Sequence, residues 1–364
     1  MLGVYLSFPF CRQKCTYCNF ASGVFADALR QKYAPALARE IAAADLSSAD
    51  TLYLGGGTPS LMSANEWAIV GQALGRREWS EATLETSPGD ITPERAALWR
   101  HWGIDRVSLG VQSFDPRVAA AAGRKHTPEM VRDEIGVLGK AGITRVNVDL
   151  IAGLAHQTEA NWLDSLDWAE RLGVEHVSVY MLEVDDESRL GEELRSGGQR
   201  YGAKNVPDED QITGFYLQAV ERLAAMGIER YEISNFARPG AESRHNLKYW
   251  SWQPYYGFGA DAHSFDGSRR WANVRTAADY VATDAPRLDE EQLDEERKLQ
   301  DFLLTGLRRS QGVALSPQQL SALDGAAAGL IERGWLEQPA PDRLRLTPDG
   351  ILFSNEVFYE LLFQ

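Results

Sequence analysis

The sequence is poor in cysteine, in long apolar runs and in positive charge. It holds three cysteines in 364 residues, all within residues 11–18. An odd set of thiols in one short window disfavours disulfides and favours a metal or redox role. No apolar run approaches the ~20 residues of a membrane-spanning helix. The start, MLGVYLSFPF, lacks the basic segment and cleavage site of a signal peptide. We therefore expect a cytoplasmic protein that is not an integral membrane protein.

Positive charge is outweighed throughout the chain. Lys and Arg number 37 against 52 Asp and Glu, which gives a formal net charge of −15. Binding to nucleic acid phosphates or anionic lipid needs clustered cations. The charge balance therefore argues against a nucleic acid partner.

What the sequence has instead is a regular alternation of strands and helices. Six β-rich apolar runs occur at 4–8, 51–56, 82–87, 106–112, 145–153 and 176–183. The stretches between them carry apolar residues at helical spacing. Gly103, Gly142 and Gly173 stand where a helix would end before the next strand. Six βα units predict an α/β fold with a parallel sheet, either a partial (β/α)6 TIM-like barrel or a doubly wound sheet. Ligands of both architectures bind at the carboxyl ends of the strands.

The last eighty residues follow a different pattern. From about residue 285 the stretch DEEQLDEERKLQDFLLTGLRRS predicts a charged amphipathic helix, followed by two helical patterns, a hairpin and an aromatic-rich helix. This order resembles a small winged-helix α+β module, for which a packing or lid role is favoured over DNA binding. We divide the chain into a barrel over 1–230, a connecting segment over 231–284 and a C-terminal domain over 285–364.

The cysteine spacing distinguishes between two kinds of metal site. Cys11, Cys15 and Cys18 follow the first strand with the spacing C-x3-C-x2-C. A structural zinc site normally takes four protein ligands in two separated pairs, and no second pair exists here. Three thiolates can hold three irons of a [4Fe–4S] cluster and leave the fourth iron open to a ligand. We favour the cluster, with zinc as the alternative.

The cysteine motif resembles that of the radical S-adenosylmethionine (SAM) superfamily. The resemblance implies a partial barrel, a [4Fe–4S] cluster, SAM bound to the open iron, and an electron donor such as flavodoxin or ferredoxin. SAM cleavage would then give methionine and a 5′-deoxyadenosyl radical, whose reactions would be the cofactor's chemistry.

Further motifs in this order are similar to the superfamily's SAM site. The run GGGTP places glycines after the second strand, where a backbone can approach a ligand closely. The resemblance implies that the glycines meet the methionine amino group, that Glu85 and Asp149 bind the ribose, and that Gln112 and Arg124 bind the methionine carboxylate or nearby groups. The SAM-site residues expected are Tyr5, Tyr17, Gly56, Gly57, Thr58, Glu85, Gln112, Arg124 and Asp149. Each strand-end polar residue alone could merely cap the barrel.

Within the superfamily, the chain resembles the oxygen-independent coproporphyrinogen III oxidase branch over nearly its whole length. GVQSFD, GRKH, DLIAGL, YEISNFA and GFGADAHSF occur in that branch's order, and the tail matches its C-terminal domain. The oxidase has a fourth cysteine two residues after the third and a long N-terminal extension. This chain has Phe20 at that position, and Cys11 lies almost at its start. The resemblance therefore favours the branch's haem chaperones and disfavours coproporphyrinogen oxidation. The oxidase and a C-methyltransferase are the alternatives.

A third motif, HNLKYW at 245–250, matches the haem-binding motif of those chaperones. His245 offers an imidazole nitrogen, the usual protein ligand of haem iron. Asn246 could orient that ring, and Tyr249 and Trp250 offer flat apolar surface to a macrocycle. The alternative is an aromatic cluster that packs the tail onto the barrel, with His245 as an ordinary hydrogen-bonded histidine.

The resemblance also implies partners and shows one departure. A haem chaperone would pass haem to haemoproteins, possible acceptors being respiratory-chain proteins, and it could act as a homodimer. Ser7 stands where the family usually has histidine, in YLSFPFC. If that histidine handles protons or contacts porphyrin near the cluster, radical chemistry would be weakened in this chain.

Overall fold

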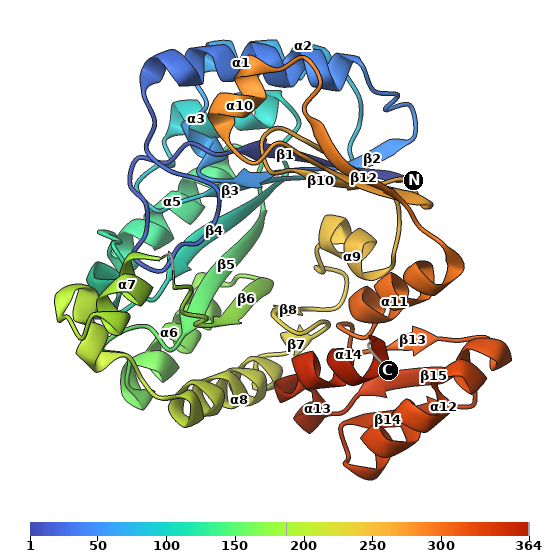
Figure 1. Cartoon of the computed structure of the whole chain (residues 1–364). Helices are drawn as coiled ribbons and strands as arrows, with labels where there is room; N and C mark the ends of the chain where they lie inside the picture. The colour runs from blue at the N-terminus through green and yellow to red at the C-terminus, as the bar shows by residue number, and fades with distance from the viewer. Residues whose placement is uncertain (187, 363–364) are drawn as a thin grey trace.

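The core of the computed structural model, which describes residues 1–186 and 188–362, is a curved sheet (Figure 1). Six parallel strands follow one another in chain order within it. They are β1 (Leu2–Phe8), β2 (Ala49–Gly56), β3 (Glu81–Thr86), β4 (Arg106–Gln112), β5 (Arg145–Ala152) and β6 (His176–Met181). The predicted partial (β/α)6 barrel is confirmed, and each strand lies within about two residues of its predicted range.

Helices cover the convex side of this sheet (Figure 1). They are α1 (Asp27–Ala42), α2 (Ala64–Leu74), α3 (Pro93–His101), α5 (Pro128–Lys140), α6 (Glu159–Leu172) and α8 (Glu209–Ala225). The short helices α4 (Pro116–Ala121) and α7 (Arg189–Arg195) bury apolar residues in a separate cluster, and 3-10 helices lie at Pro59–Leu61 and Arg200–Asn205. Gly103, Gly142 and Gly173 follow α3, α5 and α6 with φ of 90°, 83° and 66°. L side chains rarely adopt this conformation, which explains why glycine ends these helices.

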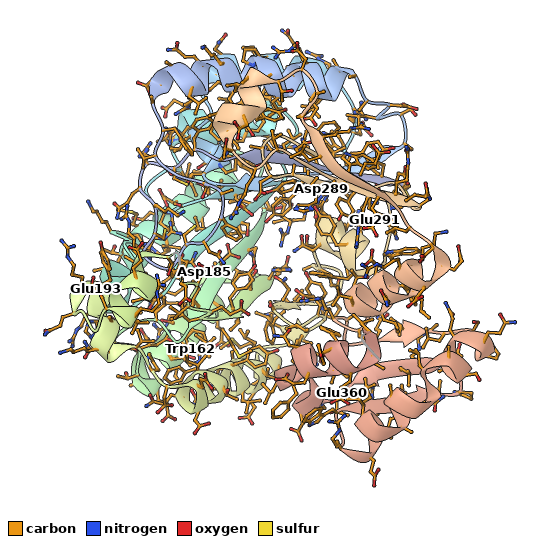
Figure 2. All side chains as sticks on the ribbon, viewed as in Figure 1. Trp162, Asp185, Glu193, Asp289, Glu291 and Glu360 are labelled. Atoms are coloured by element: carbon orange, nitrogen blue, oxygen red, sulfur yellow. The ribbon has the colours of Figure 1, made fainter. Side chains whose placement is uncertain are left out.

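Large side chains fill the layer between helices and sheet. Trp67, Trp99 and Trp162 are almost completely buried there. Trp162, labelled in Figure 2, donates its indole N–H to the Phe215 carbonyl at 2.7 Å and so joins α6 to α8. A buried tryptophan normally needs such a partner, and this one fixes the spacing of the two helices.

The sheet continues beyond the six parallel strands at both edges. β7 (Glu229–Arg230) and β8 (Asn235–Ala237) extend it next to β6. On the other side β9 (Tyr255–Phe258) pairs with β1, followed by β10 (His263–Phe265), β11 (Arg269–Asn273) and β12 (Arg287–Gln292), with α10 (Ala277–Ala282) between the last two. The segment 231–284, predicted as a connection, therefore contributes strands to the main sheet. The boundary predicted at 284/285 stays a prediction.

The prediction of a helix from about residue 285 is wrong for the first part of that stretch. The charged stretch Asp289–Gln292 lies in β12, and the helix α11 (Glu295–Gly306) begins only after it. Arg269 pairs with Glu290 at 3.0 Å and Arg270 with Glu291 at 2.7 Å, so the strand's charges are matched by its neighbour β11. Tertiary pairing overrides helical spacing here, and a charged strand suits the edge of a sheet.

A short helix, α9 (Arg244–Trp250), lies on the concave side of the sheet, next to β2 and α11 (Figure 1). Glu81, a buried residue at the start of β3, holds its first turn. Its carboxylate accepts hydrogen bonds from the Ser243 hydroxyl at 3.2 Å and from the Arg244 and His245 N–H groups at 3.1 and 3.0 Å. A carboxylate at a helix N-terminus meets both unpaired N–H groups and the positive end of the dipole.

The C-terminal module has the predicted winged-helix-like combination of a charged helix, a hairpin and a last aromatic-rich helix, but the predicted order is wrong in one respect: one helix, not two, lies between the charged helix and the hairpin, and two helices follow the hairpin. α11 is followed by β13 (Val313–Ala314), α12 (Pro317–Glu332), a hairpin of β14 (Leu336–Ala340) and β15 (Arg343–Leu346), α13 (Pro348–Leu352) and α14 (Ser354–Leu362). The three strands form a separate sheet in the order β13-β15-β14. The Arg308 guanidinium lies over the ring of Trp250 from α9 and over Phe358 of α14, which joins the module to the barrel.

No helix in the described residues is both long and apolar enough to cross a bilayer.

We predict that Glu81→Ala destabilises the fold. The substitution leaves three donors without their acceptor in a buried place, so we expect the free energy of unfolding to fall by about 3 kcal/mol. Glu81→Gln, which keeps one acceptor oxygen, should fall between this variant and the wild type. Urea unfolding measures the effect, with exposed Glu221→Ala as the control. Equal midpoints for Glu81→Ala and the control would contradict the prediction.

Candidate functional site

The cysteine loop lies at the carboxyl end of β1 and is tied to its surroundings by backbone bonds. The Cys11 N–H donates to the Gly23 carbonyl at 2.8 Å, which closes the loop on itself. The Thr16 hydroxyl donates to the Ala121 carbonyl at 3.1 Å, and its own carbonyl accepts from the Leu190 N–H at 2.9 Å. The loop is therefore held by α4 and α7 as well as by β1.

Two further side chains tie the same loop to its neighbours. Gln13 donates to the Gly123 carbonyl at 3.3 Å. Asn19 donates to Asp185, labelled in Figure 2, at 3.5 Å. Since β1, β4 and β6 all send connections to this loop, its shape depends on the whole parallel sheet.

Two of the thiols, Cys11 and Cys18, share a polar neighbour, the Ser22 hydroxyl. Burial raises the pKa of Cys11, and hydrogen bonds with Thr58 and Ser22 oppose that rise. The sulfur of Cys18 lies 4.0 Å from the Ser22 hydroxyl. All three thiols are partly exposed and none is in a disulfide.

The thiols do not converge on one point. Within the described part of the chain, no group of three or more His, Cys, Asp or Glu side chains could hold a single metal ion. Thiolates that bind three different irons of a cube need not converge in that way. The donor chemistry, three free thiols in one loop, fits a cluster of the kind the spacing predicts.

The glycine run packs against the start of the cysteine loop. A Cβ built on Gly57 would lie 2.7 Å from the Phe8 carbonyl oxygen, and one on Gly55 would lie 3.0 Å from a Glu85 oxygen. Gly56 has φ of 95°, and the Thr58 N–H donates to the Phe10 carbonyl at 3.0 Å. These glycines are needed for close contact between the ends of β1 and β2, in addition to any contact with a ligand.

Ser7 is buried against this run. Its hydroxyl would lie 2.9 Å from a Cβ at Gly56, and its backbone lies within 2.6 Å of a Cβ built on Gly259. The Ser7 carbonyl accepts a hydrogen bond from Tyr33 at 3.0 Å. The serine that replaces the family's usual histidine therefore sits in a tightly packed position.

Glu85 and Asp149 are carboxylates near the carboxyl ends of β3 and β5. The Tyr53 hydroxyl donates to Glu85 at 2.9 Å. Burial raises the pKa of Glu85 to about 7, partly opposed by this bond, while the Asp149 charge raises it further. Asp149 accepts from Ser108 at 3.1 Å and from Asn147 at 2.6 Å, and burial raises its pKa too. Both carboxylates face the concave side of the sheet.

Gln112 and Arg124 have buried polar atoms without partners. Gln112 has φ of 72°, which is strained for a non-glycine residue, at an irregularity in the β4–β5 register. In the described residues, Gln112 Oε1 and Arg124 Nε find no hydrogen-bond partner. Arg124 also donates to Ser87 at 2.8 Å and to the Tyr17 hydroxyl at 3.5 Å. The unpaired Gln112 amide oxygen and Arg124 Nε fit a ligand with amino and carboxylate groups, as SAM has.

The nine predicted SAM residues therefore gather at one edge of the barrel. Tyr17 lies between Cys15 and Arg124, Thr58 beside Cys11, and Tyr5 beside Gly55. Their roles toward SAM stay predictions.

The HNLKYW motif lies at the opposite end of the barrel. It forms α9, and His245 contacts Thr51 near the start of β2, whereas the glycine run lies at the end of that strand. Thr51 and Gly56 are five residues apart, which corresponds to about 17 Å along a strand. The structure therefore does not bring the predicted haem residues and the predicted cluster ligands together.

His245 is fully buried, and both of its ring nitrogens are hydrogen-bonded. Nδ1 lies 2.9 Å from the Thr51 hydroxyl and Nε2 lies 2.8 Å from the Tyr249 hydroxyl. Burial lowers the pKa of His245 to about 3, so the ring is neutral. A neutral imidazole can bind iron, but only after one of these bonds breaks. Its assignment as a haem ligand stays a prediction.

The other residues of the motif point in different directions. Tyr249 meets the Tyr255 ring edge-on, with centroids 4.6 Å apart. Trp250 faces the C-terminal module, and its buried indole N–H has no partner among the described residues. Asn246 donates its backbone N–H to Ser243 at 3.3 Å. The motif therefore also packs the C-terminal module onto the barrel, as expected if it is an aromatic packing cluster.

Sequence reasoning missed the partners of the predicted residues. Tyr53 holds Glu85, Ser87 holds Arg124, and Ser108 and Asn147 hold Asp149. The period-two alternation of the strands could have found two of them, because Tyr53 and Asn147 occupy inward positions two residues from a glycine and a carboxylate already singled out.

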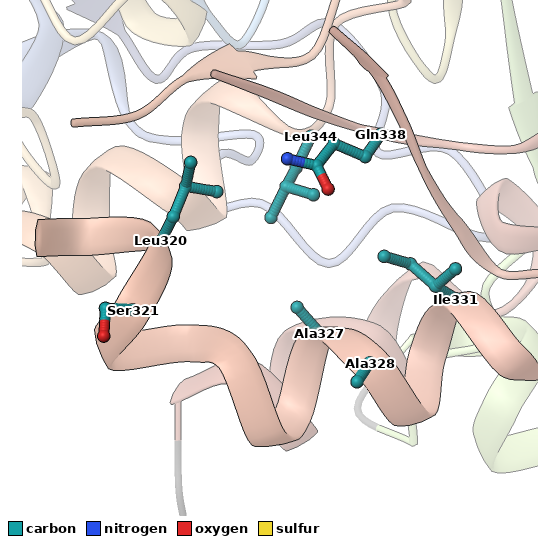
Figure 3. A pocket seen from close by; sticks show the side chains of 7 residues that line it. All are labelled: Leu320, Ser321, Ala327, Ala328, Ile331, Gln338 and Leu344. Atoms are coloured by element: carbon teal, nitrogen blue, oxygen red, sulfur yellow. The ribbon is translucent and has the colours of Figure 1, made fainter. Parts of the chain in front are cut away.

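A pocket in the C-terminal module is unrelated to this site (Figure 3). It lies between α12 and the β14–β15 hairpin. The residues that line it are Leu320, Ser321, Ala327, Ala328, Ile331, Gln338 and Leu344. None of them is a titratable group, so the pocket offers no chemistry of its own.

Comparison with known proteins agrees with this geometry. A model of the "Radical SAM superfamily" matches residues 5–169, which include the cysteine loop, the glycine run and Asp149. Two relatives named "Heme chaperone HemW" match almost end to end. The Mycobacterium tuberculosis protein is 35% identical over 99% of this chain and 94% of its own length. The Lactococcus lactis protein is 30% identical over 98% and 96%.

The chain belongs to the HemW family. Membership in the radical SAM superfamily implies a [4Fe–4S] cluster and SAM as cofactors. A solved structure, coproporphyrinogen III oxidase (HemN) from Escherichia coli, superposes with a TM-score of 0.84 over all of this chain and 90% of that one. It is 20% identical, so it supports the fold of this HemW family member and not its activity.

The raised pKa of Glu85 predicts a pH dependence of stability. Without SAM, the folded chain binds the Glu85 proton more tightly than the unfolded chain does, because the pKa rises from 4.5 to about 7. This contribution to stability is present below pH 4.5 and is lost as the pH rises to about 7. We expect the unfolding free energy of Glu85→Gln to fall less over that window than the wild type's.

The control is Tyr53→Phe, which removes the hydrogen bond that lowers the Glu85 pKa. In that variant the pH-dependent window should extend above 7. Urea titrations at half-unit pH steps measure all three proteins. Parallel profiles for wild type and Glu85→Gln would show that Glu85 titrates normally.

Proposed function

We propose that this chain is a haem chaperone, which binds haem and delivers it to haemoproteins in the cytoplasm. The observation that carries the proposal is the end-to-end similarity to proteins named heme chaperone HemW. That similarity runs through the barrel, α9 and the C-terminal module. Respiratory-chain proteins are the acceptors we propose, and flavodoxin or ferredoxin the electron donor. The chain could act as a homodimer.

The residue two positions after the third cysteine supports the chaperone over the oxidase. Phe20 stands where the oxidase has a further cysteine, and its side chain is 68% exposed. An exposed phenylalanine cannot ligate a metal. Coproporphyrinogen III oxidation is therefore not the activity we propose, although the fold is shared with that enzyme.

The cofactor site follows from the groups gathered at the barrel's edge. We propose that Cys11, Cys15 and Cys18 hold the [4Fe–4S] cluster. Gln112 and Arg124 would bind the methionine carboxylate of SAM, and Glu85 and Asp149 its ribose. With both cofactors bound, the site supplies one-electron reductive cleavage of SAM. The protein's own part is to place SAM and to hold Glu85 at a pKa near neutrality.

Each cysteine variant should lose the cluster. We expect Cys11→Ala, Cys15→Ala and Cys18→Ala, reconstituted anaerobically with iron and sulfide, to lose most of the broad absorbance near 400 nm and most of the bound iron. Ser22→Ala, which removes the hydroxyl beside Cys11 and Cys18 and leaves every thiol in place, is the matched control and should retain both. Full iron content in any one cysteine variant would remove that residue from the ligand set.

The haem proposal is tested by an anaerobic titration of cluster-reconstituted protein, followed by the Soret band. We expect saturable binding of about one haem per chain. His245→Ala should weaken it by at least tenfold if His245 is the axial ligand. Tyr249→Phe keeps the ring but frees His245 Nε2, so it should bind haem more tightly than the wild type does.

These outcomes test the chaperone proposal and the assignment of His245 as haem ligand separately. No haem binding by the wild type would contradict the chaperone proposal, and the chain would then be assayed with coproporphyrinogen III, SAM and reductant. Haem binding that is the same in His245→Ala and the wild type would keep the function and remove His245 as the ligand.

A further inference from the structure

The inward face of the barrel is lined with polar side chains. Glu85 on β3 and Ser108 on β4 face inward, since one binds Tyr53 and the other binds Asp149 across the concave side. Side chains two residues apart on a strand share a face. Thr83 and Arg106 therefore face inward as well, and they are direct partners in the β3–β4 register.

Arg106 is a buried guanidinium without a bonding partner. The residue is 3% exposed. In residues 1–186 and 188–362, no group hydrogen-bonds or forms an ion pair with it by ordinary distance criteria. Nearby arginines are different: Arg145 on β5 pairs with Asp105, and Arg124 donates to Ser87. A buried charge without a partner is costly, so this one requires a reason.

Thr83 is a second, independent orphan at the same place. It is fully buried, and its hydroxyl oxygen has no hydrogen-bond partner among the described residues. Native proteins leave few such atoms unpaired, and those that remain often await a ligand or water. A guanidinium and a hydroxyl thus lie on neighbouring strands, on one face, with unused donors.

The groups around Arg106 show that it lies inside the barrel, near a carboxylate to which it is not directly bonded. Burial raises the pKa of Tyr53 and Asp149, and the Arg106 charge opposes that rise in both. In α9, burial lowers the pKa of His245, and the Arg106 charge lowers that pKa further. Asp149 is therefore a carboxylate within reach of the Arg106 charge, but its oxygens already accept hydrogen bonds from Ser108 and Asn147.

The interior is reachable at the carboxyl edge of the sheet. Tyr180 lies two residues beyond the inward-facing Ser178 on β6, so it also faces inward. It is nevertheless 43% exposed, while burial raises its pKa. A side chain that is both exposed to solvent and surrounded by protein lines a concave surface. Tyr180 therefore marks the edge that carries the cysteine loop as the solvent-facing side of the barrel interior.

We propose that Arg106 and Thr83 bind a carboxylate group of a ligand that enters the barrel from this edge. The planar fork of a guanidinium matches the two oxygens of a carboxylate, and a hydroxyl adds a third donor. The carboxylate could belong to a propionate of haem, and in that case the inference rests on the proposed function. The other source is a small free carboxylic acid.

The first test needs no ligand. A purely structural Arg106 would make Arg106→Met less stable, whereas removal of an unpaired buried charge should make the ligand-free chain more stable. We expect a higher melting temperature for Arg106→Met than for the wild type. Arg132→Met, on the exposed face of α5, is the matched control and should melt like the wild type. A lower melting temperature for Arg106→Met would overturn the inference.

The second test identifies the ligand with cluster-reconstituted chain. We expect Arg106→Gln and Thr83→Val to weaken haem binding, the former at least tenfold, and Arg106→Lys to recover part of it. Haem dimethyl ester, which lacks free carboxylates, should bind the wild type as weakly as haem binds Arg106→Gln. Equal affinity of the wild type for haem and its ester would exclude propionate as the source.

Acetate distinguishes the remaining outcomes. If the wild type binds no haem, the proposed function fails, but acetate should still raise the melting temperature of the wild type and not of Arg106→Gln. That result would assign the site to a small acid. If neither acetate nor haem binds the wild type more tightly than Arg106→Gln, the inference is overturned. If Arg106→Gln does not fold, Thr83→Val provides the same comparison.

Discussion

Parallel pairing of β1 to β6 is the constraint on which the rest of the structure depends. Because every strand runs the same way, every connection that leaves a carboxyl end meets the others at one edge. The cysteine loop, the glycine run, Glu85 and Gln112 are far apart in sequence and adjacent in space for this reason alone. The loop has little structure of its own, and backbone bonds to α4 and α7 hold it in place.

The same pairing makes the barrel interior unusual. A closed eight-stranded barrel fills its interior with apolar side chains, but this open sheet presents Tyr53, Glu85, Arg106, Asn147 and Asp149 to its concave side. Burial raises the pKa of both carboxylates. The stability of the sheet therefore comes mainly from its convex side, where Trp67, Trp99 and Trp162 are buried under the helices. This division leaves polar groups of the concave side that α9 does not cover available to a ligand.

Much of this could be predicted from the sequence, and the exceptions have a common cause. The six strands, the helix-ending glycines and the three thiols are local patterns, so periodicity and spacing found them. The strand β12 was missed because its charges are matched only by Arg269 and Arg270 on a neighbouring strand. The unpartnered state of Arg106 was missed for the same reason, since a partner is a tertiary fact. Residue types alone revealed neither the strain at Gln112 nor the hydrogen bonds of His245.

The position of α9 links the two ends of the barrel. His245 lies under Tyr53, with ring centroids 5.3 Å apart, and the Tyr53 hydroxyl binds Glu85 at the cofactor end. At its other end α9 is joined through Trp250 to Arg308 of the C-terminal module. A haem that drew His245 away from Thr51 and Tyr249 would therefore disturb both the support of Glu85 and the contact with the module. Haem bound at His245 would then be coupled to the predicted SAM site by direct packing through one tyrosine, Tyr53, with the HNLKYW helix as the element that both share.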